Sequence, residues 1–144
     1  MPDFADASDD VTSTQRFSED LLGNAGSGLS PAEEEAIQAL PSGSALLIVK
    51  RGADIGARFL LDQDVTVAGR HPNADIFLDD VTVSRRHAEF VRHGNSFEVR
   101  DLGSMNGTYF DGVRIDSALL DDGAEVQIGK FRLTFFTSPL DKIG

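Results

Sequence analysis

A short run of polar and basic residues, Ser84-Arg85-Arg86-His87, lies inside the stretch VTVSRRHAEF (81–90). Adjacent arginines are suited to binding the phosphates of nucleic acid. A serine three residues before a histidine offers a nucleophile and a base. An arginine beside a serine hydroxyl is suited to an anion pocket. The run alone therefore leaves three kinds of chemistry open.

The distribution of charge argues against nucleic acid. The chain has 144 residues and a formal net charge of -11. Residues 1–40 hold nine Asp and Glu side chains against Arg16 alone, so most of the negative charge lies in an N-terminal arm. Repulsion from phosphates would oppose non-specific binding, and we expect no nucleic-acid partner.

The enzyme interpretation depends on Ser84 and His87 being close in sequence. No Gly-x-Ser-x-Gly elbow, third catalytic group or oxyanion donor accompanies them. Cysteine is absent, which excludes thiolate zinc sites and disulfides. The adjacent carboxylates Asp79 and Asp80 would project in opposite directions from a strand and do not suggest a metal site. We therefore expect no enzyme activity, cofactor or metal.

The elements that must position these residues are predicted to be β-strands. From Ser44 onward, short apolar or alternating runs follow one another between turn-like stretches such as RGADIG, HPNAD and DDGA. This pattern predicts an all-β sandwich or barrel of about ten or eleven short strands. Two further polar patches, GRHPNADI (69–76) and LGSMNGTYF (102–110), fall between predicted strands, where binding residues tend to lie.

The first forty residues lack strand alternation and include the linker-like stretch GNAGSG (23–28). Ser30, Pro31 and Glu33 form a capping-box pattern for one short helix that Pro41 would end. We expect a largely disordered arm over 1–42, a domain over 43–138 and a short tail over 139–144. The sequence shows no secretory signal and no apolar run long enough to span a membrane, so we expect a cytoplasmic protein without membrane contact.

The three patches resemble the pattern of forkhead-associated (FHA) domains, which bind phosphothreonine. The pattern appears as Gly69-Arg70, Ser84-Arg85-Arg86-His87 and Asn106-Gly107, and the likeness extends over roughly 41–138. It implies an FHA-type β-sandwich of about eleven short strands in two sheets, preceded by a flexible acidic N-terminal arm. It also implies that phosphothreonine is bound by Arg70, Ser84, Arg85 and Asn106, with Ser104 as a weaker candidate.

The same resemblance assigns Gly69, His87 and Gly107 to loop architecture. We expect Arg86 to lie outside the pocket, because adjacent residues of an extended chain point to opposite faces and the family pattern selects Arg85. Simpler interpretations remain for single residues. Ser84 can be an ordinary turn residue, and Asn106-Gly107 is a common tight-turn pair.

A closer resemblance is to the small actinobacterial FHA regulators of the GarA and OdhI family, on stretches such as DIFLDDVTVSRRHAEF and EVQIGKFRL. It implies a monomeric regulator that inhibits the 2-oxoglutarate dehydrogenase complex and, in mycobacterial members, acts on glutamate dehydrogenase and glutamate synthase. A Ser/Thr protein kinase would phosphorylate an arm threonine, which the FHA domain would then bind within the same molecule, turning the regulator off. The alternative is a scaffold that binds phosphothreonine on other proteins.

The arm segment VTSTQRFSEDLL (11–22) supplies the candidate phosphorylation site. Alignment on Phe17 places Thr14 on the second of the family's two threonines and Ser13 on the first, with Thr12 as a further candidate. About 30 residues separate Thr14 from the domain, which gives a flexible chain a root-mean-square span of roughly 30 Å. That span is comparable to the diameter of a small domain, so closure within one molecule is feasible.

Overall fold

The computed structural model describes residues 28–141, and these contain one α-helix, eleven β-strands and one turn of 3₁₀ helix. The helix is α2 (Pro31–Gln38), and the 3₁₀ turn is Pro139–Asp141. The first strands are β1 (Ala45–Arg51), β2 (Arg58–Leu61), β3 (Val65–Gly69), β4 (Ile76–Phe77), β5 (Ala88–His93) and β6 (Ser96–Asp101). The remaining strands are β7 (Thr108–Phe110), β8 (Val113–Ile115), β9 (Ser117–Leu120), β10 (Glu125–Ile128) and β11 (Phe131–Thr137).

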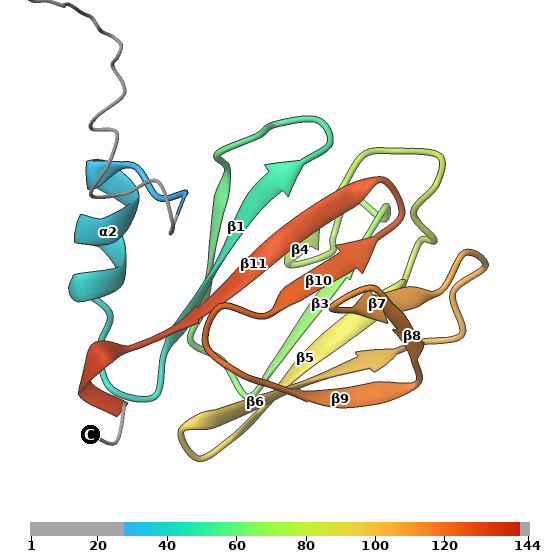
Figure 1. Cartoon of the computed structure of the whole chain (residues 1–144). Helices are drawn as coiled ribbons and strands as arrows, with labels where there is room; N and C mark the ends of the chain where they lie inside the picture. Colours follow the sequence, from blue (N-terminus) through green and yellow to red (C-terminus); the bar gives the residue numbers. More distant parts are fainter. Residues whose placement is uncertain (1–27, 142–144) are drawn as a thin grey trace, which may run out of the picture. The chain divides into compact units, whose positions relative to one another are not determined.

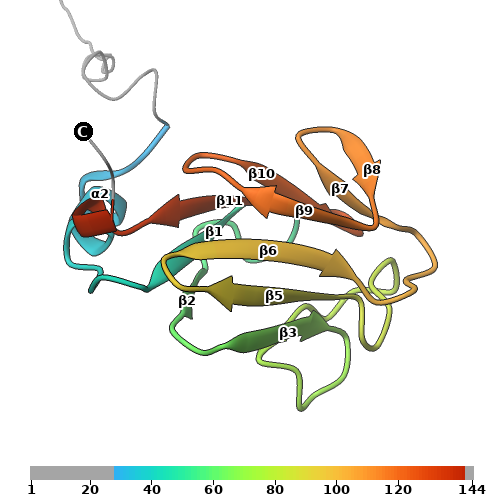
Figure 2. The same ribbon diagram turned by 90° about the horizontal axis from the view of Figure 1, so that it is seen from below.

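The strands form two sheets that face each other (Figure 1, Figure 2). The six-stranded sheet has the order β2-β1-β11-β10-β7-β8, and the five-stranded sheet has the order β4-β3-β5-β6-β9. Neighbouring strands are antiparallel except for β3 and β4. The predicted all-β sandwich of about eleven short strands in two sheets is therefore confirmed.

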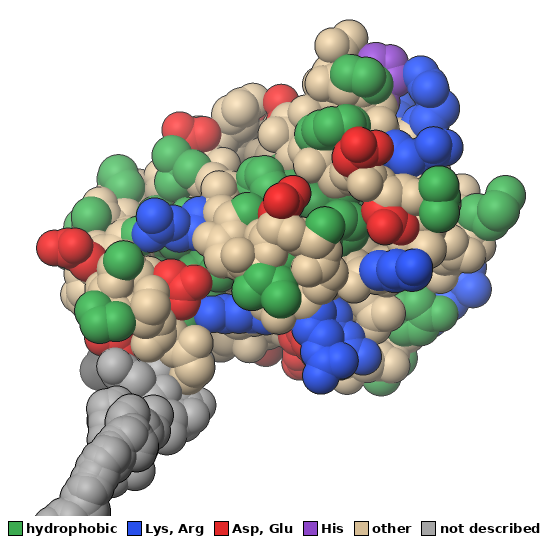
Figure 3. Space-filling view, turned by 90° about the horizontal axis from the view of Figure 1, so that it is seen from above, with side chains coloured by type: hydrophobic (Ala, Val, Ile, Leu, Met, Phe, Trp, Pro, Cys, Tyr) green, Lys and Arg blue, Asp and Glu red, His purple; other side chains and the backbone are tan. Residues whose placement is uncertain are grey.

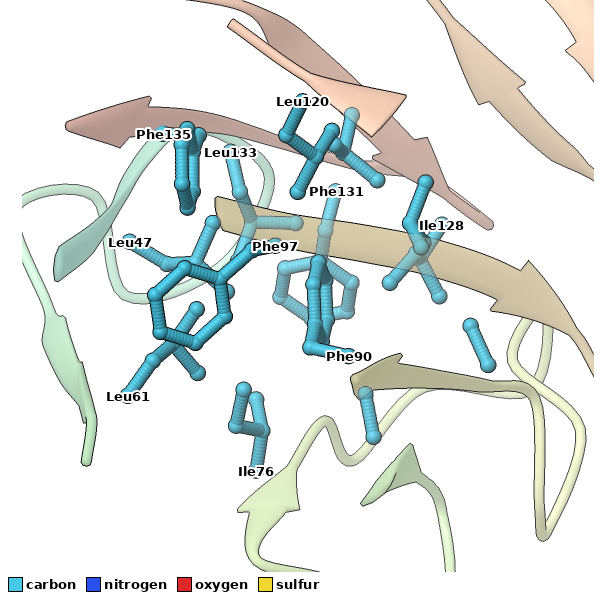
Figure 4. Packing of buried hydrophobic residues seen from close by; sticks show 14 of the residues in the cluster. Leu47, Leu61, Ile76, Phe90, Phe97, Leu120, Ile128, Phe131, Leu133 and Phe135 are labelled. Atoms are coloured by element: carbon cyan, nitrogen blue, oxygen red, sulfur yellow. The ribbon is translucent and has the colours of Figure 1, made fainter. Parts of the chain in front are cut away.

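The core lies between the two sheets and is filled by side chains that alternate along the strands. In β11, for example, Phe131, Leu133 and Phe135 are buried and the residues between them are partly exposed. The rings of Phe97 and Phe135 meet edge to face, with centroids 5.7 Å apart. Figure 4 shows this cluster, in which phenylalanine rings from both sheets interdigitate with leucine and isoleucine. The core gives the connecting loops a rigid support.

The predicted capping box is present at the start of α2. The Ser30 amide donates to the Glu33 carboxylate over 3.0 Å, and the Glu33 amide donates to the Ser30 hydroxyl over 3.1 Å. The helix ends at Gln38, before Pro41, as expected. The predicted arm thus contains a formed helix within residues 28–42. The proposed domain boundaries stay a prediction, and Thr12, Ser13 and Thr14 lie outside the described residues.

The segment that enters β1 is held by the segment that follows β11. The Gly43 amide donates to the Asp141 carboxylate over 2.7 Å, and the Ser42 hydroxyl donates to the same carboxylate. The buried Ser138 hydroxyl donates to the Leu40 carbonyl over 2.8 Å. Two stretches almost a hundred residues apart in sequence are therefore bonded together beside the sandwich.

Candidate functional site

The three motif loops lie at one end of the sandwich, at the right in Figures 1 and 2. The first follows β3, the second precedes β5, and the third connects β6 to β7. Backbone bonds join the first two, since the amides of Arg70 and His71 donate to the carbonyls of Ser84 and Arg85 over 2.9 and 3.2 Å. The sandwich topology therefore brings together motifs that are distant in sequence.

Gly69 allows the first two loops to approach closely. A Cβ atom at this buried position would lie 2.0 Å from the Arg85 carbonyl oxygen. This oxygen belongs to the backbone, so a side chain at position 69 would force the loops apart.

His87 joins the second loop to the third. The imidazole is fully buried, its Nδ1 accepts the Ser84 amide over 3.1 Å, and its Nε2 lies 2.8 Å from the Gly107 carbonyl. Because Nδ1 accepts a hydrogen bond and Nε2 donates one, the imidazole must be neutral and carry its proton on Nε2. Burial lowers the pKa of His87 below its ordinary value, which favours the same neutral form. A buried neutral base thus braces the backbone on both sides of the site.

The third loop is organised around the Asp101 carboxylate. This carboxylate accepts bonds from the Thr108 hydroxyl over 2.8 Å and from the Gly103 and Ser104 amides over 3.0 and 3.1 Å. Although burial raises the pKa of Asp101, the Ser104 hydroxyl and these other donors together hold it below the ordinary value.

The buried Ser104 hydroxyl donates its proton to Asp101 and accepts the Gly107 amide over 3.0 Å. A hydroxyl has one proton to donate, and this one is used inside the loop. A contact between Ser104 and phosphate would need that bond to be exchanged. The weaker candidacy of Ser104 stays a prediction that this geometry does not favour.

The other candidate side chains have donors to spare. Arg70 uses its Nε on the Val83 carbonyl at 3.2 Å, which leaves the N–H groups of its two terminal nitrogens. The Ser84 hydroxyl oxygen accepts the Met105 amide over 3.0 Å, and its own proton has no partner among residues 28–141. Asn106 donates from Nδ2 to the Thr82 carbonyl over 2.9 Å, which keeps its carbonyl oxygen as an acceptor.

Residues 84–87 are not in a strand, so the alternation of side chains along a strand does not turn Arg86 away from the pocket. Arg85 and Arg86 are both exposed, and both line a cavity of about 270 Å³ together with His71, Ala74 and Val67. In the described chain neither arginine forms an ion pair with a carboxylate. The expectation that Arg86 lies outside the phosphate contacts stays a prediction, without that geometric support.

Sequence reasoning missed Thr82, which fastens the second loop to the β10–β11 turn. Its hydroxyl donates to Asp80 over 2.6 Å and accepts the Lys130 amide over 3.0 Å. A Cβ atom on Gly129 would lie 2.5 Å from that hydroxyl, so glycine permits the contact. Asp-x-Thr is a recognisable turn signal. The bond to a residue 48 positions later has no counterpart in local spacing.

A two-sheet β-sandwich with these three loops at one end is the arrangement of an FHA domain. The family model described as "FHA domain" matches residues 66–129, which include all three motifs. A solved structure titled Mycobacterium tuberculosis EmbR in complex with low affinity phosphopeptide is similar, with a TM-score of 0.63 and 29% identity over 85% of this chain and 31% of that chain.

Curated relatives match over most of their length. The glycogen accumulation regulator GarA of Mycolicibacterium smegmatis is 57% identical over 140 residues, which cover 94% of this chain and 89% of the relative. The oxoglutarate dehydrogenase inhibitor of Corynebacterium jeikeium is 57% identical over 126 residues, which cover 87% and 88%. The chain belongs to this family of small FHA-domain regulators. Within residues 28–141, no helix is both long and apolar enough to cross a membrane.

Proposed function

We propose that the chain is a non-enzymatic, cytoplasmic regulator that binds phosphothreonine through Arg70, Ser84, Arg85 and Asn106. The observation that carries this proposal is the bonded assembly of three motif loops at one end of the sandwich. It leaves arginine N–H groups and a serine proton available where the loops meet. Phosphate has three strong acceptor oxygens and a charge of about −1.5 to −2 at pH 7, which suits this donor set.

The residues have distinct proposed roles. Arg70 and Arg85 supply charge-assisted hydrogen bonds, and Ser84 donates its hydroxyl proton to the same phosphate. Asn106 contacts the ligand backbone beside the phosphothreonine. The backbone bonds and the His87 brace keep these groups in place before a ligand arrives, which lowers the entropic cost of binding.

In its unphosphorylated form the regulator inhibits the 2-oxoglutarate dehydrogenase complex, and it also acts on glutamate dehydrogenase and glutamate synthase. Support comes from relatives of nearly the same length, of which several are named oxoglutarate dehydrogenase inhibitor. A Ser/Thr protein kinase phosphorylates Thr14, with Ser13 and Thr12 as less favoured sites. The domain of the monomeric protein then binds its own arm and releases the enzyme.

Calorimetric titration tests the phosphate site. A peptide of residues 9–22 carrying phosphothreonine at position 14 is added to the unphosphorylated full-length chain. Arg70→Ala and Ser84→Ala should each weaken binding by about tenfold or more, because each removes a bond to a charged group. Arg86→Ala, which removes the same charge beside the site, should lose far less. Unchanged affinity in both Arg70→Ala and Ser84→Ala would remove the assignment.

A further inference from the structure

A row of outward-facing polar residues crosses the six-stranded sheet next to the phosphate site. Cross-strand pairing places Arg51 opposite Arg132, Arg132 opposite Gln127, Gln127 opposite Tyr109 and Tyr109 opposite Arg114. The row therefore runs through β1, β11, β10, β7 and β8, has three arginines and contains no carboxylate. We call these five residues the arginine row.

A groove joins the arginine row to the phosphate site. It has a volume of about 490 Å³, and its lining includes Thr82, Asn106, Tyr109, Gln127, Lys130 and Arg132. Asn106 is itself a proposed phosphothreonine contact. Arg114 lies beside the groove, since a Cβ atom on Gly107 would be 2.7 Å from its Nε. A peptide held at Asn106 can thus continue directly onto the row.

The basic side chains along this path are not neutralised by close ion pairs within the described chain. Within residues 28–141, Arg51, Arg114 and Lys130 form no ion pair, and Arg132 has only a long contact, 4.0 Å, with Glu125. Asp80 is near enough to interact electrostatically with Lys130, although the described residues contain no ion pair between the two side chains. Figure 3 shows one face of the molecule, on which basic side chains are more numerous toward the right and acidic side chains lie among them.

We infer that the groove and the arginine row are a second binding site, which takes the acidic pair Glu19-Asp20 of the arm when phosphorylated Thr14 occupies the phosphate site. This inference rests on the proposed function. Five residues of extended chain span about 16 Å, whereas the row from β7 to β11 covers two strand spacings, about 10 Å. Glu19 therefore reaches the row without strain.

The acidic residues on the other side of Thr14, Asp9 and Asp10, are the competing occupants. Once Thr14 is bound, residues 15–27 are tethered at both ends, at the phosphate site and at the described chain from Gly28. Residues 1–13 are tethered at one end only. Ordering the doubly tethered segment costs less conformational entropy, which favours Glu19-Asp20 over Asp9-Asp10.

The test is a double-mutant cycle between peptide and protein. The receptor is the full-length Thr14→Ala chain, and the probe is the phosphothreonine peptide of residues 9–22. The Glu19→Gln/Asp20→Asn peptide should bind about three- to tenfold more weakly at low salt, as expected for two exposed ion pairs. Added salt should reduce this difference.

Protein variants locate the contact. With Arg114→Gln/Arg132→Gln in the receptor, the two peptides should bind equally, while Arg100→Gln on the other sheet should preserve the difference. If the double variant unfolds, Arg114→Gln alone should lower the difference, because Arg114 is exposed on an edge strand.

The outcomes separate this inference from the function on which it rests. If the unmodified phosphothreonine peptide does not bind, the proposed function itself fails. If it binds but Glu19→Gln/Asp20→Asn costs nothing, or costs the same in every receptor, the second site is wrong. The comparison with Asp9→Asn/Asp10→Asn is made in the Thr14-phosphorylated full-length chain, where residues 15–27 are tethered at both ends. The phosphothreonine peptide should displace the arm more easily from the Glu19→Gln/Asp20→Asn chain than from the Asp9→Asn/Asp10→Asn chain, and an equal effect would show a general charge effect and would also overturn the inference.

Discussion

His87 holds the site together through one protonation state. Protonation of Nδ1 would turn the acceptor of the Ser84 amide into a second donor and break the brace. Because the pKa is lowered in the folded protein, the unfolded chain binds a proton first as the pH falls. Stability from this group is therefore complete above about pH 6.5 and is lost between that value and the folded-state pKa.

We accordingly predict that the free energy of unfolding falls between pH 7.5 and 5.5, by at most about 1.4 kcal/mol per pH unit from this residue. Denaturant unfolding of the wild type and of His87→Gln at both pH values measures it. The variant should be less stable at pH 7.5 and less sensitive to pH. His71 and His93 are present in both proteins, so an equal pH dependence would contradict the assignment.

Residue types indicated part of the site but not its bonds. The order of glycine, arginine, serine, histidine and asparagine was readable because each type has a particular donor or backbone property. The direction of the Arg86 side chain could not be predicted, because the alternation of side chains applies to strands and residues 84–87 form a bend. Ser104 shows the same limit, since its commitment to Asp101 depends on how the loop folds.

The elements were predictable where local chemistry decides them. Period-2 alternation and turn residues indicated the strands, and Ser30 with Glu33 indicated the helix start, since those bonds span three residues. Pairings over long separations were not predictable. Thr82 forms a hydrogen bond with Lys130, which lies 48 positions later in the sequence. The arginine row depends on the pairing of Tyr109 with both Gln127 and Arg114, and this pairing can be known only from the order of the strands in the sheet.

The close approach of β3 to the second loop leads to a prediction about Gly69. Gly69→Ala should destabilise the domain by about 1–3 kcal/mol and weaken phosphothreonine binding several-fold, because the new Cβ atom collides with the Arg85 backbone. Thermal unfolding and the calorimetric titration described above measure the two effects.

Gly123→Ala is the matched control. Gly123 has a φ of +87° and nothing within 4 Å of an added Cβ, and it lies in the turn before β10, whereas the motif loops are near the other end of that strand. Its substitution should cost stability through backbone strain but leave the affinity unchanged. If Gly69→Ala also leaves the affinity unchanged, the approach of β3 does not shape the site.

For the whole molecule, we predict that phosphorylation of Thr14 closes the chain on itself. The unphosphorylated protein should inhibit 2-oxoglutarate dehydrogenase, and the kinase-treated protein should not, because the tethered phosphothreonine occupies the site. Thr14→Ala should stay inhibitory after kinase treatment, whereas Ser13→Ala should still be switched off. Enzyme assays and small-angle scattering, with a more compact phosphorylated form, measure this.

Two outcomes would contradict the switch. Equal inhibition by phosphorylated and unmodified wild type would mean that the site serves ligands on other molecules. If binding instead requires a phosphothreonine on the partner enzyme, and phosphatase treatment of the partner abolishes it, the scaffold interpretation is favoured.

The span of roughly 30 Å estimated for 30 flexible residues is an overestimate, because residues 31–38 form α2 and rise only about 1.5 Å each.

The bonds from Leu40 and Gly43 to Ser138 and Asp141 have a consequence for protein engineering. They place the entrance and exit of the sandwich beside each other, a geometry in which a domain can be inserted into a loop of a host protein. Because both connections leave from the same place, the host needs little distortion to accept them. The sandwich is therefore suited to serve as an inserted sensor domain whose three motif loops remain accessible.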